Sequence, residues 1–167
     1  MPATYEPLAT TTLGSAAASI DFNSISGSYT DLRLIVVTTA SQTLNAGIRF
    51  NSLSTTIYSG TGLIGNGSAA SSSRYTGQSY LKLDQFDGGV GTTTPVMYTV
   101  DLFNYAGSTN KTALVTHSGD LNGSGFVNRS VNLCRTTSAI TSISFYAASA
   151  GNLAAGTTAT LYGILKA

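Results

Sequence analysis

The chain has 167 residues, of which 42% are hydrophobic and only 9% are charged, and its formal net charge is +1. A typical soluble domain carries about 25% charged residues, so this composition argues against long surface helices, charged disordered tails and a basic stripe for nucleic acid. No apolar run approaches the roughly 20 residues of a membrane-spanning helix, so we expect neither a nucleic-acid partner nor a membrane partner.

Short segments in which apolar and polar residues alternate recur along the chain, which is the pattern of half-buried β-strands. These segments are 19–25, 31–39, 47–51, 79–86, 95–105, 111–117, 126–135, 140–146 and 157–165. Gly, Asn and Ser turns separate them, and no helix of any length is expected. The pattern predicts an all-β fold, an antiparallel β-sandwich that is jelly-roll-like, with about 8–10 strands. We expect one domain over residues 1–167, with residues 1–12 as a candidate extended N-terminal arm.

Threonine, rather than charged residues, fills the outward positions of these segments. Lys and Glu on edge strands normally prevent pairing with other chains, and this sequence has one Glu, Glu6, in all. The composition therefore favours a protein whose faces and edges are covered by partners, although a monomer with closed edges would satisfy it equally.

The segment 52–73 is rich in Gly and Ser and is predicted to form a long exposed loop or a weak strand. Within it, Gly60, Gly62 and Gly65 match the letters G-x-G-x-x-G. A dinucleotide site needs that motif between a strand and a helix, so that the phosphate meets the helix N-terminus. No helix is predicted after Gly65, so we interpret the motif as a loop without a phosphate site.

Candidate catalytic groups are few. His117, Ser118 and Asp120 are close in sequence, but neighbouring strand residues point to opposite faces, so we expect a surface or interface histidine rather than a triad. Asp84 and Asp87 flank a predicted turn and are interpreted as turn-forming residues. We expect no catalytic residues and no enzymatic activity.

Metal and cofactor sites are also not expected. The single cysteine, Cys134, excludes an intramolecular disulfide and is predicted to be a half-buried strand residue. One cysteine and one histidine are too few soft ligands for a structural zinc site.

Three tyrosines in or near the Gly-rich segment, Tyr58, Tyr75 and Tyr80, are the best candidates for an exposed aromatic platform that contacts a partner. Such a platform could stack on sugars or pack against a protein, although packing in the core is the favoured role for these rings.

Both ends of the sequence resemble a family of small virion structural proteins of tailed bacteriophages. The similarity lies in YEPLATTTLGSAAASIDF at 5–22, in SI at 24–25 and YTDL at 29–32, in SAITSI at 138–143 and in GTTATLYGI at 156–164. The resemblance implies a virion component with a β-sandwich fold, described variously in this family as decoration, fibre or tail protein. It also implies homo-oligomers, with a trimer favoured, and contacts with the major capsid protein or other virion proteins.

The sequence thus favours a capsid decoration or cement protein that binds and stabilises the head shell without catalysis. Because residues 1–6 lack the features of a signal peptide, we expect synthesis in the host cytoplasm and localisation in the virion. The first alternative is a tail-fibre or receptor-binding tip that recognises host surface glycans. A polysaccharide-degrading enzyme and a free lectin-like domain are weaker alternatives.

Overall fold

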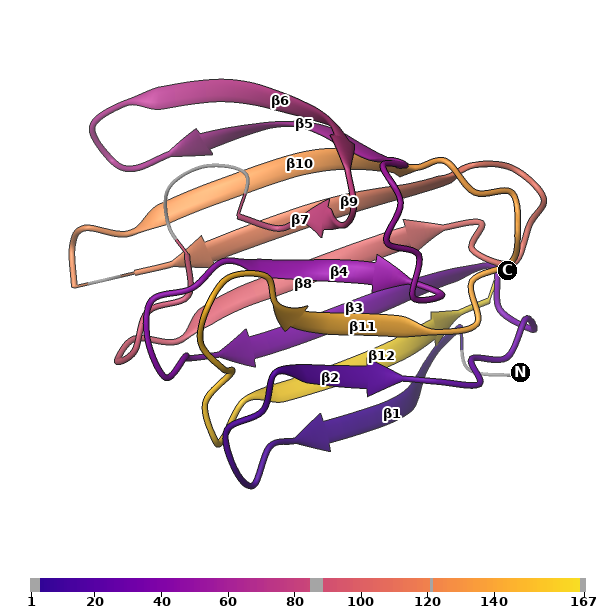
Figure 1. Cartoon of the computed structure of the whole chain (residues 1–167), viewed down its shortest axis with the longest axis horizontal. Helices are drawn as coiled ribbons and strands as arrows, with labels where there is room; N and C mark the ends of the chain where they lie inside the picture. Colours follow the sequence, from indigo (N-terminus) through magenta and orange to yellow (C-terminus); the bar gives the residue numbers. More distant parts are fainter. Residues whose placement is uncertain (1–3, 85–88, 121, 166–167) are drawn as a thin grey trace.

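A computed structural model describes residues 4–84, 89–120 and 122–165 of the chain. These residues form twelve strands in two antiparallel sheets that pack face to face (Figure 1). The larger sheet contains, in spatial order, β1 (Tyr5–Thr12), β12 (Thr158–Ile164), β3 (Asp31–Thr38), β8 (Val96–Phe103), β9 (Lys111–Gly119), β10 (Phe126–Cys134), β5 (Tyr58–Gly65) and β6 (Ala70–Gln78). The smaller sheet contains β2 (Ser19–Phe22), β11 (Ile143–Ala147), β4 (Ala46–Phe50) and β7 (Leu81–Lys82).

The predicted fold class is confirmed: the chain is an all-β antiparallel sandwich that passes repeatedly from one sheet to the other, as in a jelly roll. No helix that could cross a membrane occurs in the described part of the chain.

Alternation along the strands places the core between the two sheets. In β3, Leu32, Leu34 and Val36 are buried, whereas the residues between them are partly or well exposed. In β8, Val96 and Tyr98 are buried in the same way. The four-stranded sheet covers this inner face of the eight-stranded sheet, so the even positions of β3 and β8 become core.

The number of strands exceeds the prediction because two segments that were not counted among the strands also form strands. Tyr5–Thr12 was expected to be an arm, but it is edge strand β1 and pairs with β12 along its length. The Gly-rich segment was expected to be a long exposed loop or a weak strand, and the strand alternative holds: it forms the β5–β6 hairpin, and the G-x-G-x-x-G letters fall inside β5. In Figure 1 this hairpin lies at the top of the eight-stranded sheet, beyond β7.

Candidate functional site

The outer face of the eight-stranded sheet, which points away from the small sheet, carries every exposed large hydrophobic residue in the described part of the chain. Directly paired residues share a face, and the strand registers place all of these side chains opposite the core. They are Tyr5 (40% exposed), Val37 (44%), Leu63 (60%), Met97 (45%), Phe103 (43%), Val127 (62%) and Val131 (49%). We call this surface the outer face.

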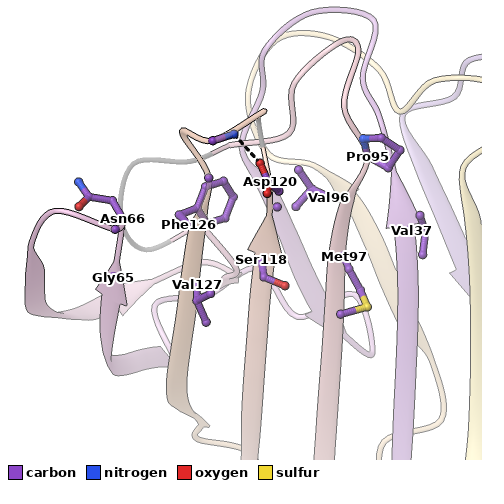
Figure 2. A pocket seen from close by; sticks show the side chains of 14 residues that line it. Val37, Gly65, Asn66, Pro95, Val96, Met97, Ser118, Asp120, Phe126 and Val127 are labelled. Carbon is purple, nitrogen blue, oxygen red and sulfur yellow. Dashed lines mark hydrogen bonds between the residues drawn. The ribbon is translucent and has the colours of Figure 1, made fainter.

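A shallow groove of about 580 Å³ crosses one end of the outer face. Its floor is a transverse row in which Val37, Met97, Ser118 and Val127 lie side by side on β3, β8, β9 and β10 (Figure 2). The tips of the β5–β6 and β9–β10 hairpins form its wall. The residues that line the groove there are Gly65, Asn66, Gly67, Gly119, Asp120, Gly123 and Gly125. The groove is therefore mainly apolar and open to solvent.

Two charges on β3 and β8 of the outer face, Arg33 and Asp101, are paired with each other, while Arg129 on β10 is exposed on the same face. The Arg33 guanidinium donates two hydrogen bonds to the Asp101 carboxylate, Nε to Oδ1 at 2.5 Å and Nη2 to Oδ2 at 2.9 Å. This contact raises the pKa of Arg33 further above its ordinary value. A bidentate pair is close to neutral as a unit, so it interrupts the apolar surface less than two separate charges would.

Among the described residues that line the groove, Asp120 is the ionisable side chain and Ser118 the hydroxyl side chain. Asp120 lies at its rim, where its Oδ1 accepts a hydrogen bond from the Gly123 backbone N–H at 2.8 Å and stabilises the β9–β10 turn (Figure 2). Ser118 lies on the floor, and the neighbouring His117 points to the other side of the sheet. In the described ranges, no three His, Cys, Asp or Glu side chains gather as a metal site would require.

His117 is in the core, so the expectation of a surface or interface histidine is wrong. Its ring is 1% exposed and stacks on Tyr98 with centroids 4.3 Å apart, and Phe126 packs on it at 4.6 Å. Neither ring nitrogen has a hydrogen-bond partner among the described residues, and burial lowers the pKa of His117 to about 3. The imidazole is therefore neutral.

Asp84 is also buried rather than turn-forming. Its carboxyl group accepts hydrogen bonds from the Ala46 backbone N–H and from the Tyr98 hydroxyl, the latter at 2.6 Å, and its Oδ1 lies 3.5 Å from Nδ1 of His117. Burial raises the pKa of Asp84 to about 7, although both hydrogen bonds oppose the shift. Asp87, the other half of the predicted turn, lies outside the described residues.

Comparison with known proteins adds similarity in structure but none in sequence. No family model and no curated protein sequence matches the chain. Among solved structures, the galectin LEC-6 of Caenorhabditis elegans superimposes with a TM-score of 0.38 and 12% sequence identity, covering 94% of this chain and 96% of the galectin. At this level the two proteins are similar in sandwich architecture alone.

The three candidate aromatic residues do not form one platform. Tyr58 is fully buried, so its candidate role in an exposed platform is wrong and the favoured role in the core is confirmed. Tyr75 is half-buried, donates from its hydroxyl to Asn132 Oδ1 at 2.8 Å and accepts from the Lys82 backbone N–H at 3.1 Å. Tyr80 is half-buried and packs edge-on against Tyr146, with ring centroids 5.9 Å apart. A partner contact by Tyr75 or Tyr80 stays a prediction.

Tyr58 acts as a hydrogen-bonded core residue, and this role can be tested. Its hydroxyl accepts from the Phe50 backbone N–H at 3.1 Å and donates to the Leu53 carbonyl at 3.2 Å. Tyr58→Phe keeps the ring but leaves both backbone groups without this partner, so we expect a loss of about 1–3 kcal/mol in unfolding free energy. Urea unfolding would measure it, and an unchanged midpoint would contradict this role.

Cys134 is likewise deeper than expected: it is fully buried at the end of β10 rather than half-buried, and burial raises the pKa of its thiol.

The outer face is the feature that sequence reasoning missed. A signal for it exists, because β3 and β10 carry apolar residues such as Val37, Val127 and Val131 at positions that a solvent-covered strand fills with polar ones.

Proposed function

We propose that this protein is a non-enzymatic structural component of a tailed-bacteriophage virion, a capsid decoration protein that binds the head shell through its outer face. The observation that carries the proposal is the gathering of seven exposed large hydrophobic side chains on one sheet face. The resemblance of both chain ends to phage virion proteins supplies the kind of partner.

The outer face has the dimensions of a protein interface. Eight strands spaced about 4.8 Å apart, each about seven residues long, cover roughly 900 Å². A stable protein–protein contact buries about 800 Å² on each partner.

The scarcity of charge supports the same use. Ions that become buried at an interface must lose their water, and this penalty can exceed the attraction gained. Only 9% of residues are charged, and Arg33 and Asp101 on the outer face neutralise each other, whereas the exposed Arg129 and Arg74 add positive charge to that face. A surface of this kind loses little on docking, and many copies on a symmetric shell would multiply a modest affinity.

The tail-fibre alternative has less support from the structure than from the sequence. It depended on an exposed platform of Tyr58, Tyr75 and Tyr80, and Tyr58 lies in the core. The groove on the outer face is lined mainly by aliphatic, glycine and small polar residues, and its one aromatic ring, Phe126, is only 7% exposed because it packs against His117. It therefore offers little of the exposed aromatic surface on which sugars stack.

The location and copy number of the protein in purified particles test the proposal. We expect density for the sandwich on the outside of the head in a cryo-EM map, with copies in the hundreds by quantitative mass spectrometry. A handful of copies confined to the tail tip would overturn the decoration role in favour of a fibre. Absence from the particle would overturn both.

A charge placed on the outer face should weaken shell binding. Val127→Glu introduces a carboxylate where a 62% exposed apolar side chain would be covered, so we expect at least about tenfold weaker binding to particles that lack the protein. Ser54→Glu, at an exposed position in the β4–β5 loop, is the matched control and should bind normally. Equal binding by both variants would show that the outer face is not the contact.

A further inference from the structure

The two outer edges of the eight-stranded sheet differ in how they are protected against strand pairing. At the β1 edge, Pro7 lacks a backbone N–H, and a bulge interrupts the register between Pro7 and Ala9. At the β6 edge, the strand 70–78 has no proline and one charged residue, Arg74. The β1 edge therefore has a proline and a bulge within its ladder, whereas the β6 edge has only Arg74 and an irregularity near its end.

Strand β6 is also regular and open where a new strand would add. Its pairing with β5 is uninterrupted over residues 70–75, and the irregularity lies beyond, near Gly77, whose φ is +64°. The side chains of residues 70–74 are all exposed. A row of main-chain donors and acceptors in an extended segment is satisfied best by another extended segment.

We infer that β6 is a self-association edge, where it pairs antiparallel with β6 of a second copy around a twofold axis at Ser72. A twofold axis requires one surface that is complementary to itself, and antiparallel pairing of a strand with its own copy meets that condition. The pairing also continues the wholly antiparallel order of the sheet, with no other element needed.

The position of the axis follows from the faces of the strand. Ala70, Ser72 and Arg74 share the outer face, because they pair with Gly65, Leu63 and Thr61 of β5. Residues directly opposite each other must share a face, so an axis at Ser72 sets Ser72 opposite its own copy and Arg74 opposite Ala70 of the second copy.

Competing positions of the axis are less favourable. An axis at Arg74 would set two guanidinium groups opposite each other, and directly opposed like charges destabilise a strand pair. An axis one residue beyond Ser72 would draw Thr76 and the irregular end of β6 into the ladder. With the axis at Ser72, Arg74 lies opposite Ala70 of the second copy, and Gly65 of that copy lies beyond Ala70. The open space beside Gly65 leaves room for the Arg74 side chain.

Disulfide trapping tests this geometry. Directly opposite strand residues have Cα atoms about 4.5–5.5 Å apart, which falls within the 4.4–6.8 Å range that a disulfide spans. Ser72→Cys should therefore form a covalent dimer under mild oxidation. The native background is clean, because the only other cysteine, Cys134, is fully buried.

Thr10→Cys is the matched control, because Thr10 is exposed and lies at the β1 end of the same transverse row that ends in Ser72 on β6. We expect Ser72→Cys to cross-link at least about tenfold faster than Thr10→Cys, since pairing raises the local thiol concentration. Equal rates would overturn the inference.

Light scattering on the parent protein supplies a second readout that needs no cysteine. We expect a concentration-dependent dimer, and Ser72→Lys should shift it to monomer by setting two ammonium groups face to face. A monomer at every concentration, a trimer, or a dimer that Ser72→Lys leaves intact would each overturn the inference. These results do not depend on the virion role, which is tested on particles.

Discussion

Replacing Asp84 by asparagine is expected to make the fold lose stability as the pH falls from 6.5 towards 4, whereas His117→Phe should make it gain stability over the same range. In the parent protein the two side chains should cancel each other. The unfolding free energy of each variant should change by about 1.4 kcal/mol per pH unit, the value for one proton taken up or released on unfolding. Over two pH units this amounts to roughly 3 kcal/mol.

The signs follow from the directions of the two pKa shifts. Burial raises the pKa of Asp84 from 3.8 to about 7, so the stability linked to this group is complete below pH 3.8 and is lost as the pH rises towards 7. Burial lowers the pKa of His117 from 6.5 to about 3, so the stability linked to it is complete above pH 6.5 and is lost as the pH falls.

The cancellation does not depend on which of the two groups holds the proton. Oδ1 of Asp84 and Nδ1 of His117 are 3.5 Å apart, so they titrate as a pair. Between about pH 4 and 6.5 the folded pair binds one proton, and the unfolded chain also binds one, on the histidine. Folding therefore neither takes up nor releases a proton through this pair.

Urea unfolding followed by tyrosine fluorescence at several pH values would measure these slopes, since the chain has no tryptophan. Phenylalanine suits position 117, because the ring packs between Tyr98 and Phe126 and its nitrogens make no hydrogen bond among the described residues. The other carboxylates are common to all variants, so only differences from the parent matter. Parallel curves for parent and variants would show that the pair is not buried in this way.

Alternation of side chains was enough to predict the sandwich, because it is strong wherever one face is core. Leu32, Leu34 and Val36 in β3 and the matching positions of β8 were placed on one face from sequence, and that face is buried. Which face the small sheet covers cannot be read from a strand that is apolar on both sides. Val37 and Met97 therefore indicated strands that are apolar on both faces, but not which of the two faces is exposed.

Long-range partners explain what was missed in the polar core. Asp84 is buried because groups 38 and 14 residues away in sequence, the Ala46 N–H and the Tyr98 hydroxyl, meet its carboxyl group. Local composition around Asp84, with glycines following it, is that of a turn. Tyr58 was a candidate for an exposed ring because local composition is misleading there too: its strand contains glycines, which usually indicate a loop.

The glycines of β5 allow this strand to lie close to β10. We therefore expect Gly62→Ala to destabilise the protein by about 1–3 kcal/mol. A methyl group at Gly62 would lie 2.7 Å from the Ser130 Cβ and 3.0 Å from the Arg129 carbonyl oxygen, both on the neighbouring strand β10. These atoms belong to the backbone or are attached directly to it, so they can move aside only if the two strands separate. In most strands, alanine in place of glycine is instead mildly stabilising.

Gly65→Ala is the control on the same strand, because nothing lies within 4 Å of a Cβ built there and its φ is not in the left-handed region. Urea unfolding should separate the two variants, with Gly65→Ala at or slightly above the parent. Because the strain falls between β5 and β10, hydrogen exchange in Gly62→Ala should quicken first in the β5–β6 hairpin, and dimerisation through β6 should weaken with it. Equal stability of the two variants would mean that β5 does not approach β10 this closely, and that the glycines of β5 indicate a loop after all.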